Sequence, residues 1–229
     1  MRRALLLLAF VGPSLGAQQA LSEFDRYKAE AILRDQLPCL GCHELNGNGG
    51  HSAPPLTTVA QRRSAADIRG IIEDPQGMNA ASAMPRVPMV PATRELIIRY
   101  LGGSEAPSTE PAALKRIARP AENVVRQPAE NAVQLYQRFC SSCHGRNGSG
   151  DGPNARYLPV RPAIHNSAAA MSKRSDDALF DAISGGGIVM GKSPRMPAFG
   201  QTLTPAEIRG LVAYVRQLCS CSGPTWSTR

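Results

Sequence analysis

The chain contains one five-residue motif twice, and this motif limits what the chain can fold around. Two cysteines three positions apart, followed at once by histidine, occupy residues 39–43 and again residues 140–144. This CxxCH spacing is typical of c-type haem attachment, in which both thiols bond the haem and the histidine ligates the iron. The sequence therefore predicts two covalent haem c groups, attached through Cys39, Cys42, Cys140 and Cys143, with His43 and His144 as iron ligands.

Two other uses of paired cysteines fit less well. A zinc ribbon places its CxxC pairs about 15 to 20 residues apart, whereas these begin 101 positions apart and both carry the histidine. A thioredoxin-like dithiol needs a neighbouring βαβ pattern, and these flanks have helical and glycine-rich patterns instead.

The N-terminus has the layout of a secretory signal peptide over residues 1–17. Arg2 and Arg3 precede an apolar run over 4–11, and small residues follow near a plausible cleavage point. The run is too short to span a bilayer, although an uncleaved anchor stays an alternative. We expect an exported, periplasmic protein that meets membranes only through a partner complex or that N-terminus.

Charge is unevenly distributed along the 229 residues. Residues 18–102 carry nine basic and nine acidic side chains, 103–130 carry four of each, and 131–229 carry eleven basic against five acidic. The basic part predicts redox partners with an acidic docking surface, with scattered solvated charge as the alternative, and no nucleic-acid partner is expected. The basic residues around the second motif are Arg156, Arg161, Lys173, Arg174, Lys192 and Arg195.

The composition indicates two units joined by a linker. Prolines recur between residues 103 and 130, where large apolar residues are few, which is typical of a semi-rigid linker; a short helix over 112–118 is the alternative. Only 5% of the residues are aromatic, so each core is expected to be modest without its haem. The predicted domains are 18–102 and 131–229.

Both units are predicted to be helical. In the second, an apolar face over 132–139 leads into Cys140, Ser175 begins a middle helix that 185–187 ends, and Thr204 with Glu207 forms a capping box. In the first, Ser64 caps a helix that stops before Pro75, and a closing helix includes 96–101. No stretch alternates with period two over enough length for a sheet, so the expected fold class is all-α.

The sixth iron ligand must come from elsewhere in each unit. Met84 with Pro85 and Met196 with Pro197 lie 16 and 18 residues before Tyr100 and Tyr214, and this equivalent placement predicts Met84 and Met196 as ligands. Met89 and Met78 compete in the first unit, and Met190 and Met171 compete in the second. His51 and His165 are expected to be exposed loop residues.

Two smaller expectations concern the neighbouring loops and the C-terminus. Pro55 and Pro153 are candidates for the carbonyl that fixes each haem-ligating imidazole. Cys219 and Cys221 are expected to form a local or intermolecular disulfide, or to be idle thiols.

Together these residues resemble the class I cytochrome c family, specifically its tandem dihaem members such as the cytochrome c4-like electron carriers. The resemblance covers roughly 21–102 and 129–219 and rests on both motifs, the segment 196–200, the glycines of 148–152 and the helix ending at Tyr214. It implies two haem-wrapping helical domains whose His/Met-ligated irons carry single electrons. The first domain departs from the pattern, because it lacks an equivalent aromatic before Cys39.

The resemblance implies a carrier, because a fully ligated iron leaves no position for a substrate. An electron-transfer subunit of a larger oxidoreductase is one alternative. A dihaem enzyme of peroxidase or thiosulfate-oxidising type is the other, and it would need a spare His or Cys near the haem.

Overall fold

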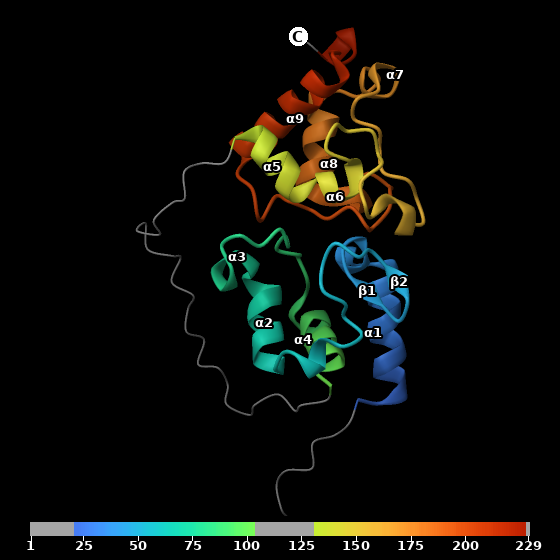
Figure 1. Ribbon diagram of the computed structural model, residues 1–229, viewed down its shortest axis with the longest axis vertical. Coiled ribbons are helices and arrows are strands. Elements are labelled where there is room, and N and C mark those ends of the chain that lie inside the picture. The colour runs from blue at the N-terminus through green and yellow to red at the C-terminus, as the bar shows by residue number, and fades with distance from the viewer. Residues whose placement is uncertain (1–20, 104–130, 228–229) are drawn as a thin grey trace, which may run out of the picture.

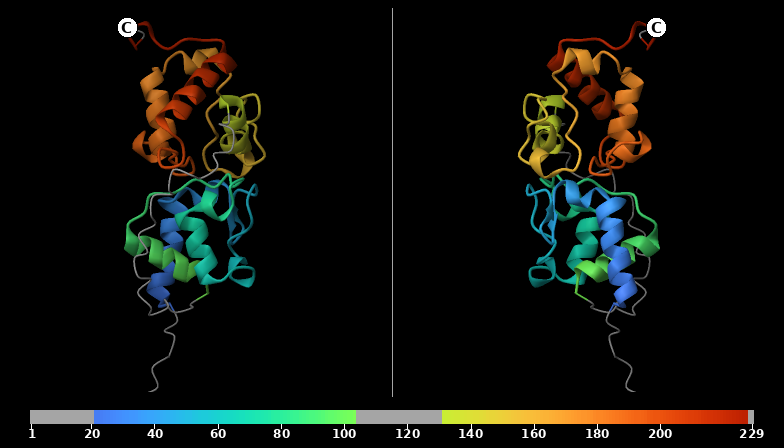
Figure 2. Two further views of the ribbon diagram at one scale, coloured as in Figure 1. Left: turned by 90° about the vertical axis from the view of Figure 1, so that its left-hand side faces the viewer. Right: turned by 90° about the vertical axis from the view of Figure 1, so that its right-hand side faces the viewer.

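The computed structural model describes residues 21–103 and 131–227 as two helical units, with the predicted linker between them. Figures 1 and 2 show the units stacked along the long axis of the molecule. The predicted signal peptide and almost all of the predicted linker lie outside the described residues. Within the described part, no helix is long and apolar enough to cross a membrane.

The first unit consists of short helices around an aliphatic core. Its elements in chain order are α1 (Glu23–Asp35), η1 (Pro38–Gly41), β1 (Glu44–Leu45), β2 (Asn48–Gly49), η2 (Val59–Gln61), α2 (Ala65–Glu73), α3 (Pro75–Met78) and α4 (Pro91–Leu101). Helix α4 packs against both α1 and α2, and Leu33, Ile97 and Ile98 are almost completely buried between them. Burying each such side chain contributes about 2 kcal/mol to folding.

The one helix start expected in the first unit is confirmed. Ser64 and Asp67 form the reciprocal capping box of α2, and the helix ends at Glu73, before Pro75. The two-residue strands β1 and β2 are an addition to the expected pattern. Their connection places Asn46 and Gly47 at φ 50° and 81°, the pair of positive angles that a tight hairpin turn requires.

The second unit contains the two longest helices of the described residues and more aromatic residues in its core. Its elements are α5 (Ala132–Phe139), α6 (Ser141–His144), η3 (Ala155–Tyr157), α7 (Ala168–Met171), α8 (Asp176–Val189), α9 (Pro205–Cys219) and η4 (Thr225–Ser227). Helix α9 packs against both α5 and α8 and buries Ile208, Leu211 and Val215. The capping box of Thr204 and Glu207 and the start of α8 at Ser175 are both confirmed.

The regular part of α8 ends at the predicted glycines, 185–187. Gly186 leaves the helical conformation with a φ of 77°, and a further turn beyond this kink continues to Val189. A Cβ atom at Gly186 would lie 2.9 Å from the carbonyl oxygen of Met196. The interruption therefore lets the backbone at Met196 lie directly against α8.

The all-α fold class is confirmed: the described residues form two helical units with only the β1–β2 pair as sheet.

Candidate haem sites and the contact between them

The first CxxCH motif lies on a helical turn that begins at η1. Pro38 starts the turn, and the backbone N–H of His43 donates to the carbonyl of Cys39 at 2.9 Å. This turn places Cys39 and Cys42 beside each other as free thiols. Burial raises the pKa of each thiol to about 11, so both are neutral near pH 7.

The second motif has the same geometry on a more regular helix. Helix α5 runs into α6, and the N–H of His144 donates to the carbonyl of Cys140, again at 2.9 Å. Burial raises the pKa of Cys140 to about 12 and also raises that of Cys143. Both motifs therefore present a pair of free cysteines and a histidine within one turn of backbone.

Each motif histidine is held by a backbone carbonyl. The Nδ1 atom of His43 lies 2.7 Å from the carbonyl oxygen of Pro54, and that of His144 lies 2.9 Å from the carbonyl oxygen of Ala163. The assignment of these acceptors to Pro55 and Pro153 was therefore wrong.

The loop hydrogen bonds explain the difference. In the first unit, Ala53 and Leu56 each bond back to the motif segment, at 3.1 Å and 2.8 Å, and present the carbonyl between them to His43. In the second, Asn154 bonds to the carbonyl of Ser142 at 2.9 Å, so Pro153 lies in a turn beside the motif and a later segment supplies the acceptor.

These contacts fit a haem iron. A carbonyl oxygen can only accept, so Nδ1 of each histidine carries the proton and Nε2 is left as the metal-binding atom. Burial also lowers the pKa of both His43 and His144, which favours the neutral imidazole that binds metal. By contrast, the described residues contain no cluster of three or more His, Cys, Asp or Glu side chains such as a zinc site would need.

Met196 lies in a segment that its own domain holds. The N–H of Gly187 in α8 donates to the carbonyl of Met196 at 3.0 Å, and Phe199 and Gly200 donate to the carbonyls of Ile183 and Ser184. Three main-chain hydrogen bonds thus fix residues 196–200 along α8. The competitor Met171 is 1% exposed in the core, and Met190 is 37% exposed at the end of α8.

Met84 lies in a segment, residues 82–90, that forms neither helix nor strand. Its carbonyl accepts from Nε2 of Gln76 at 2.6 Å, and its N–H donates to Oγ of Ser82 at 3.2 Å. Met84 and Met89 both pack on the first core, whereas Met78 is 52% exposed.

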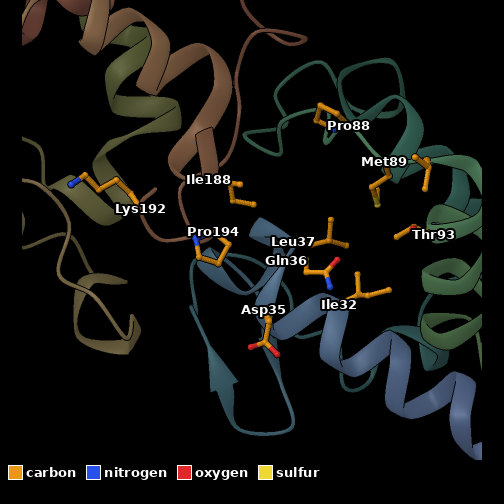
Figure 3. Close-up of a pocket in the computed structure, with 11 residues that line it drawn as sticks. Ile32, Asp35, Gln36, Leu37, Pro88, Met89, Thr93, Ile188, Lys192 and Pro194 are labelled. Carbon is orange, nitrogen blue, oxygen red and sulfur yellow. The ribbon is translucent and has the colours of Figure 1, made fainter. Parts of the chain in front are cut away.

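Met89 also faces a cavity of about 540 Å³ between the two units. Figure 3 shows Met89 on the same wall as Thr93, with Ile188, Lys192 and Pro194 of the second unit across the opening. Met84 does not line this cavity.

The two spare histidines have different surroundings. His51 is exposed, as predicted, and its ring lies 4.2 Å from that of Tyr157. His165 is not an exposed loop residue: its ring stacks on that of His144 at 4.0 Å, and its Nδ1 lies 3.0 Å from the Tyr136 hydroxyl. Burial, and secondarily His144 and Arg174, lower the pKa of His165 to about 3.

The two motifs meet where the units join. The Cys143 sulfur lies 3.9 Å from the carbonyl oxygen of Gly41, inside the first motif. Gly41 also faces the backbone of Arg195 so closely that a Cβ atom there would overlap its carbonyl oxygen. Glycine in the first CxxCH therefore allows the second unit to approach this turn.

Asn154 is the buried centre of this contact, with 1% of its surface exposed. Its Nδ2 donates to the carbonyl of Gly41 at 3.0 Å and to Oγ of Ser52 at 2.6 Å, and its Oδ1 accepts from the N–H of His51 at 2.9 Å. All three bonds cross between units, so the carboxamide joins the two loops that follow the CxxCH motifs.

Asn154 is not predicted by the sequence, because no local pattern marks a partner 113 residues away. The one available signal was the pair of glycines at 41 and 50, since a Cβ atom at Gly50 would lie 2.9 Å from Nδ2 of Asn154.

The C-terminal cysteines form the local disulfide that was one of the expectations. Cys219 and Cys221 are bonded to each other at the end of α9. Arg216 stands beside them and donates to Asp176 at 2.8 Å and to the carbonyl of Met171 at 2.8 Å. The pair belongs to the packing of the helix end.

The match to a known family agrees with the two-unit architecture. The cytochrome c family pattern matches residues 31–102 and 129–219. A similar solved structure is a chain of the reducing HAO-like protein complex of Kuenenia stuttgartiensis, with 20% identity, a TM-score of 0.32, and coverage of 78% of this chain and 79% of that one. No curated protein matches the sequence significantly. Because the family pattern covers both motif-bearing units and most of the chain, the protein belongs to the cytochrome c family.

Proposed function

We propose that this protein is an exported dihaem cytochrome c that carries single electrons between redox partners. The observation that carries the proposal is the equivalent arrangement of His43 and His144, each fixed through Nδ1 beside a pair of free thiols. Bound haem supplies reversible one-electron oxidation and reduction at its iron. Two sites built alike support two haems in one chain.

The contact between the motifs supports exchange of electrons within the chain. The 3.9 Å approach of Cys143 to Gly41 and the buried Asn154 hold the two attachment turns against each other. A fixed geometry removes the need for the domains to move before each transfer.

We assign Met84 and Met196 as the sixth ligands. Sulfur ligation raises the potential relative to a second histidine, and a fully ligated iron offers no position to a substrate, which favours a carrier over an enzyme. Met171 is buried in the core, whereas Met190 and Met78 are exposed, and these positions support the choice. Met89 packs on the first core and stays the alternative in the first domain.

Spectroelectrochemical titration of the purified holoprotein tests the assignment. We expect two one-electron waves and a sulfur-to-iron charge-transfer band, about half of which disappears in Met84→Ala and half in Met196→Ala. Met89→Ala is the matched control and should keep the full band. An unchanged band in Met84→Ala would refute Met84 as the ligand, and loss of part of the band in Met89→Ala would assign Met89 instead. A haem that binds exogenous ligands without resistance would refute the carrier with two His/Met sites.

The proposed partner surface needs one revision. Arg195 does not face outward, because its Nη1 lies 3.3 Å from the carbonyl oxygen of Leu33 in the first domain and burial lowers its pKa. Arg156, Arg161 and Lys173 are exposed, and we propose that they meet the acidic surface of a redox partner. Electron transfer to an acidic partner should slow as ionic strength rises; a flat rate would contradict the steering.

Exposed apolar side chains favour a second candidate, a subunit of a larger oxidoreductase. Ile188 and Val189 at the end of α8 are 55% and 63% exposed, and Val160 is 60% exposed. Such side chains are common at protein interfaces when they form a patch. Native mass spectrometry of the protein isolated from its source would show a stable larger assembly if the protein is a subunit, and the single chain if it is a free carrier.

A further inference from the structure

We propose that the second domain positions the Met84 segment of the first domain, through the guanidinium of Arg138. This inference rests on the proposed function, because it takes Met84 as the sixth ligand of the first haem. Arg138 is then a positioning residue: it lies in the other domain and acts through the backbone that carries the ligand.

The first observation is a pair of bonds from one side chain. Nη2 of Arg138 donates to the carbonyl of Ala80 at 2.6 Å and to the carbonyl of Ser82 at 2.8 Å. Both acceptors lie within four residues of Met84. Ser82 in turn accepts from the N–H of Met84 through its hydroxyl at 3.2 Å, so Arg138 holds the residue that holds Met84.

A second contact from the other domain lies just beyond Met84. The N–H of Arg86 donates to Oγ1 of Thr202 at 2.9 Å. The segment that contains Met84 and Pro85 is therefore bonded to the second domain on both sides. Within its own domain it is held by Gln76 and by the ion pair of Arg86 with Asp74.

Arg138 is itself held in place by the second domain. Its guanidinium carbon lies 4.9 Å from the centre of the Phe139 ring, and that ring packs edge to face on Phe199 at 5.5 Å. Phe199 is 4% exposed and belongs to the segment that follows Met196. A chain of packed side chains thus connects the Met196 segment of one domain to the Met84 segment of the other.

The two methionine segments need this support to different degrees. Residues 196–200 make three main-chain hydrogen bonds with α8 and its end. Residues 82–90 belong to no helix or strand, and side chains supply the contacts that restrain Met84. Loss of Arg138 should therefore weaken methionine ligation at the first haem and leave the second haem unchanged.

Binding of imidazole to the ferric full-length holoprotein tests the proposal, because imidazole competes with methionine for the iron. Arg138→Ala should raise the imidazole affinity of the first haem about 10- to 100-fold, since two hydrogen bonds to a charged group are lost. Thr202→Val should act in the same direction and less strongly. Arg146→Ala, at an exposed arginine of the same domain, is the matched control and should change nothing.

A further variant separates positioning from general loosening of the domain contact. Asn154→Ala removes the three central bonds without touching residues 79–86. If it raises imidazole affinity as much as Arg138→Ala does, or if Arg138→Ala and Thr202→Val leave the affinity unchanged, the positioning role is overturned. The spectrum of Met84→Ala tests the proposed function by itself. If Met84→Ala keeps the full charge-transfer band, Met84 is not the ligand, and the positioning role of Arg138 fails for that reason.

Discussion

The two domains carry the same motif but hold its histidine in different surroundings. His43 bonds to a carbonyl 11 residues further along the chain, in a compact loop. His144 bonds to a carbonyl 19 residues further along and has the ring of His165 stacked on it. From His165 the ring contacts continue edge to face to Tyr136 and on to Tyr214, at 5.8 Å and 5.1 Å between ring centres.

The difference supports the proposal that the second methionine segment is held within its own domain, whereas the Met84 segment of the first also depends on its neighbour. Aromatic rings support the second histidine from the inside, and main-chain bonds to α8 fix the second methionine segment. The first domain has an aliphatic core and receives Arg138 and Thr202 from outside. Changes in the second domain should therefore reach the first site more than the reverse.

The largest expected effect comes from removing one attachment motif at a time. In Cys140→Ala/Cys143→Ala and in Cys39→Ala/Cys42→Ala, covalent haem should fall from two per chain to one, measured by intact mass. The first of these variants should also disturb the charge-transfer band of the remaining haem, because the second domain loses apolar core and with it the fixed position of Arg138. The second variant should leave the band of its remaining haem unchanged. Equal disturbance of the remaining charge-transfer band in both variants would contradict the proposed asymmetry between the domains.

The next effect concerns the central contact between the domains. Asn154→Ala should lower the free energy of unfolding by about 2 to 3 kcal/mol, because it removes three hydrogen bonds and leaves buried partners on both sides unsatisfied. Chemical denaturation followed by far-UV circular dichroism measures this. Asn166→Ala, at an exposed asparagine of the same domain, should cost less than about 0.5 kcal/mol. Equal small losses in both variants would show that Asn154 does not hold the domains together.

Local patterns predicted the helices well, because their signals lie within a few residues of one another. The capping boxes of α2 and α9 each need only positions 64 and 67, or 204 and 207, and both formed as expected. The CxxCH turn is similarly local. The glycines at 185–187 also marked where the regular part of α8 ends, but the further turn beyond Gly186 and the close approach of Met196 to it lie outside any local pattern.

The contacts that join the domains could not be predicted from such patterns. Asn154 lies in a loop, Arg138 resembles any polar residue near a helix end, and their partners are 113 and 56 residues away. The same limit applies to the carbonyls that accept from His43 and His144, since the path of each loop depends on its bonds back to the motif. The roles of these residues depend on how the two folded domains pack against each other.

The smallest expected effect compares two tyrosines, one in each domain. The Tyr100 hydroxyl donates to Glu30 at 2.9 Å, and burial together with this bond raises its pKa from 10.0 to about 12. The pKa of Tyr136 is also raised, mainly by burial. A folded state that keeps the phenolic proton loses stability as pH rises above about 10, where the unfolded chain releases it.

Phenylalanine at either position removes the contribution of that tyrosine to the pH dependence. At pH 7, each of Tyr100→Phe and Tyr136→Phe should lower the free energy of unfolding by about 0.5 to 1 kcal/mol, the value of one hydrogen bond. Between pH 10 and 12 each variant should lose less stability than the parent protein, because one proton fewer is released on unfolding. Tyr27→Phe, at a side chain that is 68% exposed, serves as the control. A steeper loss of stability in Tyr136→Phe than in Tyr100→Phe would mean that Tyr136 contributes less than Tyr100 to the pH dependence of the parent protein. The Tyr136 hydroxyl would then be poorly shielded by its own domain, which would contradict the conclusion that the second domain carries the more self-contained polar and aromatic network.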